Sequence, residues 1–189
     1  MALAFDICLP AVFVGVIVLI PIVVRIIYQY ERGILFRLGK YAGTREPGLT
    51  IVIPILEELR KVDVRILTLD IPKQSVMTRD NVPVSVNGVL YFKVVKPEDA
   101  IIKVQNYEYA MGQYAQTALR DVVGAMSLDD VLSERTAIGE KIRKVVDEGT
   151  MEWGLDVTAI KLQDVEVPDD LKRMMSRQAS AEREKRATI

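Results

Sequence analysis

An uninterrupted apolar run near the N-terminus, Ile7–Val24, constrains this chain more than any other feature, because it contains no charged residue. A helix of this length spans about 27 Å at 1.5 Å per residue, close to the ~30 Å hydrocarbon core of a bilayer. A soluble core helix would need a polar face, and this run has none. We therefore expect residues 1–27 to form a membrane anchor. Its expected lipid-facing residues are Leu9, Val12, Val16, Leu19, Ile22 and Ile26.

Two forms of this anchor are open, a kinked single span and a shallow hairpin with both ends on one side. Pro10 lies near the expected helix start, whereas Pro21 lies inside the run, where it kinks or ends a helix. Lysine and arginine are absent before the run and frequent after it. The positive-inside bias therefore favours a span in the cell membrane that places the rest of the chain in the cytoplasm. A cleavable signal peptide fits badly, because the cationic start and the small-residue cleavage site are missing.

The residues that follow have the composition of a membrane–water interface. Cationic and aromatic side chains alternate there, which predicts an interface belt of Arg25, Tyr28, Tyr30 and Arg32. Cys8, near the other boundary, is the single cysteine of the chain, so an internal disulfide is excluded. It is a candidate for S-acylation, although a small apolar residue is the simpler interpretation.

Composition removes most enzyme classes. The chain has no histidine, which excludes Ser-His and Cys-His nucleophilic catalysis, and a single cysteine makes a structural zinc site improbable. Lys+Arg (25) nearly balances Asp+Glu (26), so no charge excess indicates a nucleic-acid partner. The adjacent carboxylates Asp129 and Asp130 and the hydroxyl of Ser133 are better explained as helix caps and solvated groups than as hydrolase residues. We expect neither catalysis nor a cofactor or metal.

The body of the chain alternates with period two in several places. The clearest case is residues 82–94, with valine, leucine and phenylalanine on one face and polar residues on the other, which predicts a half-buried strand. The pattern over residues 59–71 slips between Ile66 and Leu67, and a similar slip occurs near Ala159; each suggests a bulge or a bend. The first strand is expected around residues 34–38, and turns are expected at residues 43–48 and 78–81.

Two helical stripes separate these strands, over residues 110–126 and 128–146. Ser127 and Asp130 have the spacing of a capping box at the start of the second helix, and Gly154 follows it as a cap. The pattern predicts an α+β domain over residues 28–168, an antiparallel sheet with helices packed on one side. Residues 169–189 combine helix-favouring residues with dense mixed charge, typical of the start of a coiled coil. Contacts between subunits are one interpretation of Glu182, Arg183, Glu184 and Arg186, and a solvated face is the other.

Several ordered stretches resemble one family, the stomatins or slipins, within the wider SPFH (band 7) group of prohibitin- and flotillin-like membrane proteins. They include "YERGILFRLGKY", "PGLTIVIP", "KVDVRILTLDIPKQSVMTRDNVPVSVNGVLYFKV", "NYEYAMGQYAQTALRDVVGAMSLDDVLSERTAI" and "WGLDVTAIKLQDVEVPDDLKRMMSRQASAEREKRA". None is a catalytic fingerprint, but together they cover nearly everything from Tyr28 onwards.

The resemblance implies a non-enzymatic scaffold. Its domain would lie against the cytoplasmic face of the membrane, and subunits would associate laterally into ring- or cage-like homo-oligomers. Such an assembly organises a membrane microdomain and regulates other membrane proteins. The alternative that the resemblance implies is a regulatory partner or substrate of an NfeD-type membrane serine protease. Family members continue into a long coiled coil, so we expect the charged helix that reaches Ile189 to be the start of a longer one.

Overall fold

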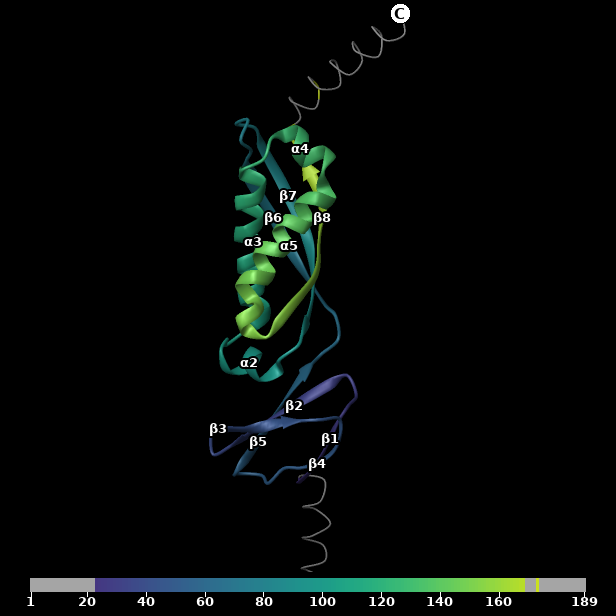
Figure 1. Cartoon of the computed structure of the whole chain (residues 1–189), viewed down its shortest axis with the longest axis vertical. Helices are drawn as coiled ribbons and strands as arrows, with labels where there is room; N and C mark the ends of the chain where they lie inside the picture. The colour runs from purple at the N-terminus through teal and green to yellow at the C-terminus, as the bar shows by residue number, and fades with distance from the viewer. Residues whose placement is uncertain (1–22, 169–172, 174–189) are drawn as a thin grey trace, which may run out of the picture.

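A computed structural model describes residues 23–168 and 173, and it consists of two halves stacked end to end along an elongated molecule (Figure 1). The smaller half contains five short strands, and the larger half contains three long strands covered by helices (Figure 1). Within this described part, no helix is both long and apolar enough to cross a membrane. The predictions for residues 1–22, 169–172 and 174–189 lie outside it.

The larger half is built on an antiparallel sheet with the order β6-β7-β8. Its strands are β6 (Leu67–Met77), β7 (Pro83–Val94) and β8 (Leu155–Glu166). Alternate side chains of β7 point to opposite faces of the sheet, and those on one face are buried: Val84, Val86, Leu90, Phe92 and Val94. This confirms the predicted half-buried strand. The predicted bulge near Ala159 is also confirmed, because the pairing of β7 with β8 shifts between Tyr91 and Phe92.

Helices α3 (Tyr107–Gly124) and α5 (Arg135–Thr150) cover one face of this sheet, as predicted (Figure 1). Their core-facing residues include Met111, Leu119, Val123, Ile138, Ile142 and Val146, none of which is measurably exposed. The short helices are α2 (Pro97–Ile102), α4 (Leu128–Ser133) and the 3-10 turn η1 (Met151–Trp153). The prediction of one helix over residues 128–146 was wrong, because the backbone of Glu134 (φ −110°, ψ 38°) separates α4 from α5.

The smaller half contains two further antiparallel sheets, so the prediction of a single sheet was wrong. Strands β1 (Val24–Ile27) and β4 (Gly48–Ile51) form a two-stranded ribbon. Strands β2 (Glu31–Arg37), β3 (Lys40–Arg45) and β5 (Glu57–Asp63) form a three-stranded sheet with the order β3-β2-β5. The ribbon packs on this sheet through Ile27, whose Cδ1 atom lies where a side chain on Gly33 would stand.

The structure corrects two other predictions in this half. The turn expected at residues 43–48 is shorter, since only Glu46 and Pro47 separate β3 from β4, and the chain first reverses at Leu38 and Gly39, whose φ angles of 51° and 77° suit a tight hairpin turn. Gly43 instead lies within β3. The slip between Ile66 and Leu67 marks a bend and not a bulge, because β5 ends at Asp63, the chain bends at Arg65, and Leu67 starts β6 in a different sheet. The predicted turn at residues 78–81 is confirmed, with a hydrogen bond of 2.9 Å from the Asn81 amide to the Thr78 carbonyl.

Candidate membrane-facing end

The β1–β4 ribbon carries an exposed apolar face. Val24 pairs with Ile51 and Ile26 pairs with Leu49, and because paired antiparallel residues project to the same side, these four side chains share one face. Ile26, Leu49 and Ile51 are 55%, 77% and 69% exposed. The ribbon begins at Val24, the last residue of the apolar run that was predicted to be the anchor.

The loop after β4 extends this surface. Ile53, Ile55 and Leu56 are all exposed, and Ile55 is as accessible as in an extended chain. The exposed Leu38 of the β2–β3 turn joins them, since its amide donates a hydrogen bond of 2.8 Å to the Leu56 carbonyl. We call the eight side chains the apolar end: Val24, Ile26, Leu38, Leu49, Ile51, Ile53, Ile55 and Leu56.

The backbone of the apolar end is strained. Ile55 has a φ of 81° and Leu38 a φ of 51°, both in the left-handed region. This conformation is unusual for any residue with a side chain and a marked outlier for a β-branched one, with a cost of about 1–3 kcal/mol. Strain of this kind persists where surrounding contacts enforce it, and here it directs apolar side chains away from the protein.

A carboxylate supplies such contacts for the Ile55 loop. The side chain of Glu57 is only 5% exposed. Its Oε1 accepts hydrogen bonds of 2.9 and 2.8 Å from the Nε and Nη2 of Arg37, and its Oε2 accepts one of 3.1 Å from the Ile53 amide. The Ile53 amide, followed by Arg37, holds the pKa of Glu57 below its ordinary value. The ionised carboxylate of Glu57, which follows the loop, therefore binds the Ile53 amide at the start of the loop and fixes the segment that presents Ile55. We call this arrangement the Glu57 clamp.

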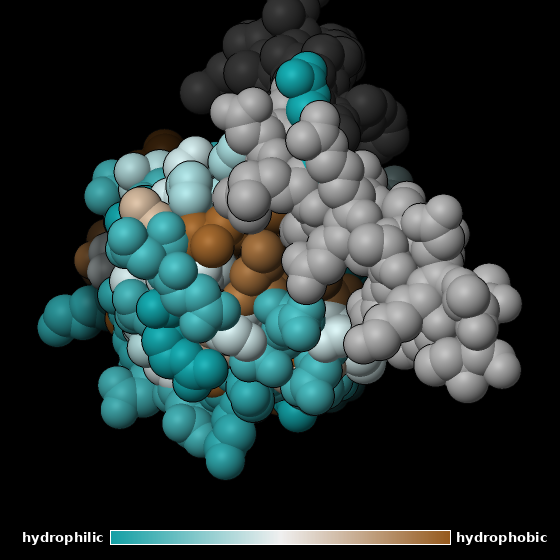
Figure 2. Space-filling view, turned by 90° about the horizontal axis from the view of Figure 1, so that it is seen from above, coloured by the Kyte–Doolittle hydropathy of each residue, from teal (hydrophilic) through white to brown (hydrophobic). Residues whose placement is uncertain are grey.

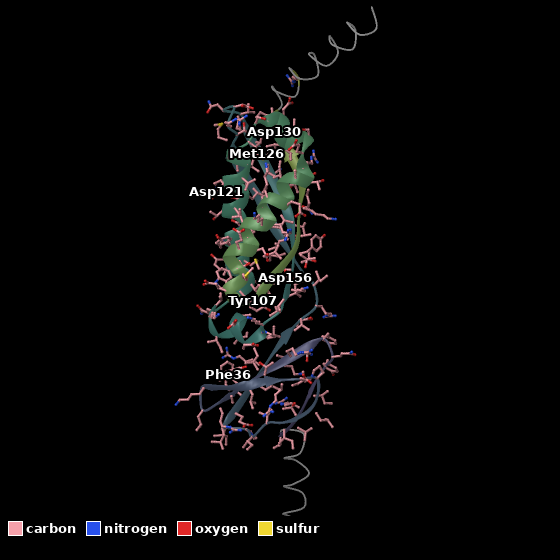
Figure 3. The ribbon with its side chains drawn as sticks, viewed as in Figure 1. Phe36, Tyr107, Asp121, Met126, Asp130 and Asp156 are labelled. Atoms are coloured by element: carbon pink, nitrogen blue, oxygen red, sulfur yellow. The ribbon has the colours of Figure 1, made fainter. Side chains whose placement is uncertain are left out.

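The opposite end of the molecule has a different surface. Helix α4 lies there, together with Met126 and Asp130, far from Phe36 in the smaller half (Figure 3). Viewed from this end, hydrophilic residues form most of the rim, and hydrophobic atoms show in the middle (Figure 2). The apolar end and the α4 end are thus distinct surfaces, and the apolar end is the one that adjoins the predicted anchor.

The structure brings together two of the four predicted belt residues. The rings of Tyr28 and Tyr30 stack with centroids 5.5 Å apart. The cations that flank them are Lys61, 5.3 Å from the Tyr28 centroid, and Arg65, 4.4 Å from the Tyr30 centroid. These two residues were missed because they come from β5 and the connection after it, more than thirty residues along the chain.

The other predicted site residues divide into two groups. Arg25 and Ile26 lie in β1 and Arg32 in β2, so Ile26 belongs to a strand and not to an extension of the apolar run. The remaining anchor residues, the acylation candidate and the subunit-contact candidates lie outside the described residues: Cys8, Leu9, Val12, Val16, Leu19, Ile22, Glu182, Arg183, Glu184 and Arg186.

Of the groups considered for hydrolase chemistry, Asp130 caps helix α4 and Ser133 bonds within it. Ser127 and Asp130 form the predicted capping box, with each side chain bonded to the other residue's amide. The hydrogen bonds from Ser127 hold the pKa of Asp130 below its ordinary value. Ser133 donates a hydrogen bond of 2.7 Å to the Asp129 carbonyl within the same helix. Among the described residues, no group of three or more Cys, Asp or Glu is placed to hold a metal ion.

Comparison with known proteins gives a consistent result. The sequence profile of the SPFH domain / Band 7 family matches residues 25–189. A protein of Archaeoglobus fulgidus is 50% identical over 166 residues, which are 88% of this chain and 67% of that protein. A stomatin homolog of Pyrococcus horikoshii is 45% identical over 92% of this chain and 65% of its own length. Mouse stomatin is 38% identical over 95% of this chain and 65% of its own length. The chain thus spans about two thirds of the length of these relatives.

Proposed function

We propose that this chain, which belongs to the SPFH/band 7 family and to its stomatin branch, is a membrane-associated scaffold that organises other membrane proteins. The observation that carries the proposal is the apolar end, an exposed hydrophobic surface beside the predicted anchor. In this proposal the apolar end lies in the lipid headgroup and acyl boundary on the cytoplasmic side. The larger half projects away from the bilayer.

Energetics support this orientation. Soluble proteins rarely expose a contiguous apolar surface of this kind, and when they do it usually marks a protein or membrane contact. Transfer of one large aliphatic side chain from water into an apolar medium contributes about 1.5–3 kcal/mol. Several side chains of the apolar end together would therefore outweigh the strain at Ile55 and Leu38 and hold the domain against the bilayer.

Membrane confinement gives the scaffold its mechanism. A tethered domain moves in two dimensions, so the effective concentration of its neighbours is high and contacts of low affinity suffice for lateral assembly. We propose that the assembly is a ring or cage of identical subunits. Charged residues of the tail, such as Glu184 and Arg186, would set the register between subunits, since exposed ion pairs contribute only ~0.2–1 kcal/mol each.

The direct test places a reporter on the apolar end. In a Cys8→Ser background, a polarity-sensitive fluorophore is attached to the full chain at Ile55→Cys and, as a matched control, at Tyr109→Cys, a position that is also exposed (68%) but lies on α3 in the larger half. After reconstitution in nanodiscs, we expect a blue shift and quenching by spin-labelled lipid at position 55 and neither at position 109. Equal, water-like spectra at both positions would refute the proposed orientation.

A second test concerns assembly. Native mass measurement of the full chain in lipid nanodiscs and in native extracts should give large, uniform oligomers. A monomer under both conditions would refute the scaffold. A membrane protease that co-purifies with a monomeric chain would support the NfeD-type partnership instead.

A further inference from the structure

We propose that a pocket between β1 and β5 binds the phosphate of an anionic lipid headgroup, an inference that rests on the proposed function because the pocket adjoins the apolar end. The pocket has a volume of about 430 Å³. Arg25 and Lys61 supply its cationic lining, and Val52, Pro54 and Leu59 supply its apolar lining. Such a combination of charge and apolar wall suits an amphiphile.

Arg25 is the principal cation of this pocket. Alternation along β1 places it on the same side as Ile27, which is 2% exposed, and opposite the apolar face that contains Ile26. Its guanidinium makes no ion pair or hydrogen bond with any residue of the described part of the chain. A guanidinium presents five donors in a planar fork, which matches the geometry of phosphate oxygens.

Lys61 closes the other side of the pocket. Its Nζ donates a hydrogen bond of 2.6 Å to the Ile26 carbonyl and lies 3.1 Å from the Oε2 of Glu31. These two contacts use two of the three ammonium donors, and the ammonium also lies 5.3 Å from the Tyr28 ring centroid, so Lys61 contributes its positive charge to the pocket. Because its bond to Ile26 also ties β5 to β1, Lys61 holds its ammonium close to the strand that carries Arg25.

Two carboxylates also line the pocket, and each is matched by a cation from elsewhere. Glu57 is bound by Arg37, and Glu58 lies 2.8 Å from the Nε of Arg60. The surrounding half of the protein is cationic: residues 23–63 contain seven Lys and Arg against four Glu and one Asp, an excess of two positive charges, whereas the whole chain has a net charge of −1. An anion is therefore attracted to this end of the molecule.

The position of the pocket favours a lipid over a free anion. Val52 and Pro54 alternate along the chain with Ile51, Ile53 and Ile55, so the pocket and the apolar end are two sides of one loop. A phosphate at Arg25 would leave acyl chains beside the apolar end, in the layer where the proposed orientation puts the bilayer. Anionic headgroups contribute about 1 kcal/mol per nearby cation, which corresponds to about a fivefold change in affinity.

The test measures headgroup selectivity in the full chain. Protein in mild detergent is titrated with phosphatidylglycerol or phosphatidylcholine, and bound lipid is counted by native mass spectrometry. We expect half-saturation with phosphatidylglycerol at a concentration about fivefold lower than with phosphatidylcholine. Arg25→Gln should bring this ratio close to one. Arg45→Gln, which removes a charge from β3 outside the pocket, should leave it unchanged. Equal melting temperatures of the three proteins establish that the pocket is folded.

Three outcomes would overturn the proposal. An equal loss of selectivity in both variants would assign it to the overall charge of this half and not to the pocket. Displacement of phosphatidylglycerol by millimolar inorganic phosphate would make the pocket a site for soluble anions. Equal binding of the two lipids by the unaltered chain, together with lipid quenching at position 55, would refute the headgroup site while leaving the proposed function intact.

Discussion

Gly139 of α5 lies directly over the carbonyl oxygen of Ile160 in β8, so close that a Cβ atom at position 139 would stand 2.5 Å from that oxygen. Real Cβ atoms essentially never approach an oxygen so closely, and backbone on both sides leaves little room for adjustment. The glycine thus sets the distance between the helix and the edge strand. It also explains why a residue of low helix propensity stands in the middle of α5.

Gly139→Ala is therefore expected to destabilise the fold by about 1–3 kcal/mol, because the helix must move away from the sheet. Gly112→Ala is the matched control, since the nearest atom to its new Cβ is the flexible Cδ2 of Leu69 at 3.3 Å. That control should be neutral, or more stable by up to ~1 kcal/mol through helix propensity. Chemical denaturation of the full chain in detergent measures both. Equal stability of Gly139→Ala and the unaltered protein would contradict the close packing.

The capping box of α4 gives a second prediction. Ser127→Ala removes the hydroxyl that accepts a hydrogen bond from the Asp130 amide. This change should lower the free energy of unfolding by about 1 kcal/mol. It should also raise the pKa of Asp130 towards its ordinary value, because Ser127 is the main cause of the lowered pKa. Ser133→Ala, which removes a hydroxyl bonded within the helix, serves as control and should change neither quantity by much. A similar loss of stability in both variants would argue against the cap.

Sequence patterns predicted the larger half better than the smaller one. Residues 82–94 have one polar and one apolar face, so their period identified both the strand β7 and its buried side. The capping residues Ser127 and Asp130 act over one turn of helix, and such local chemistry is readable directly. The break between α4 and α5 at Glu134 could not be predicted in this way, because the apolar residues on either side of it keep the helical period.

The smaller half was harder because its apolar residues do not separate into faces. In the stretch from Leu49 to Pro54 only Thr50 is polar, a pattern equally consistent with a buried strand and with a lipid-facing one. The exposure of Ile55 depends on a positive φ that no local pattern indicates. The pocket was missed for another reason: Arg25 and Lys61 come together only because the β1–β4 ribbon packs on the separate sheet that contains β5.

The connection between the two halves gives a third prediction. Arg65 binds Asp63 through hydrogen bonds to both carboxylate oxygens, and this interaction holds the pKa of Asp63 below its ordinary value. Arg65→Gln should raise the pKa of Asp63 and remove the cation that lies over the Tyr30 ring. Arg60→Gln should leave the pKa of Asp63 unchanged. Carboxyl-carbon NMR measures the titration. A group with a lowered folded-state pKa stabilises the fold above the unfolded pKa, and this contribution disappears as the pH falls through the folded value. An unchanged Asp63 titration in Arg65→Gln would contradict the pairing.

The Glu57 clamp on the loop that presents Ile55 gives the last prediction. The pKa of Glu57 is lowered by the Ile53 amide and by Arg37, so at neutral pH the carboxylate is ionised and holds the loop. Glu57→Gln should weaken its hydrogen bonds to the Ile53 amide and to Arg37, because a neutral amide is a poorer acceptor than a carboxylate. A nitroxide at position 55, in the Cys8→Ser background, should become more mobile by electron paramagnetic resonance. Glu58→Gln is the matched control, because Glu58 pairs with Arg60 and does not contact the loop amide.

The same clamp predicts the pH dependence of the loop. Because the folded-state pKa of Glu57 is lowered, the stabilisation by its carboxylate is complete above the ordinary carboxyl pKa and disappears as the pH falls through the lowered value. Mobility at position 55 should therefore rise on acidification in the unaltered chain and in Glu58→Gln. In Glu57→Gln it should already be high at neutral pH and change little. An acid transition of equal size in Glu57→Gln would show that another group controls the loop, and the strained presentation of Ile55 would then need a different explanation.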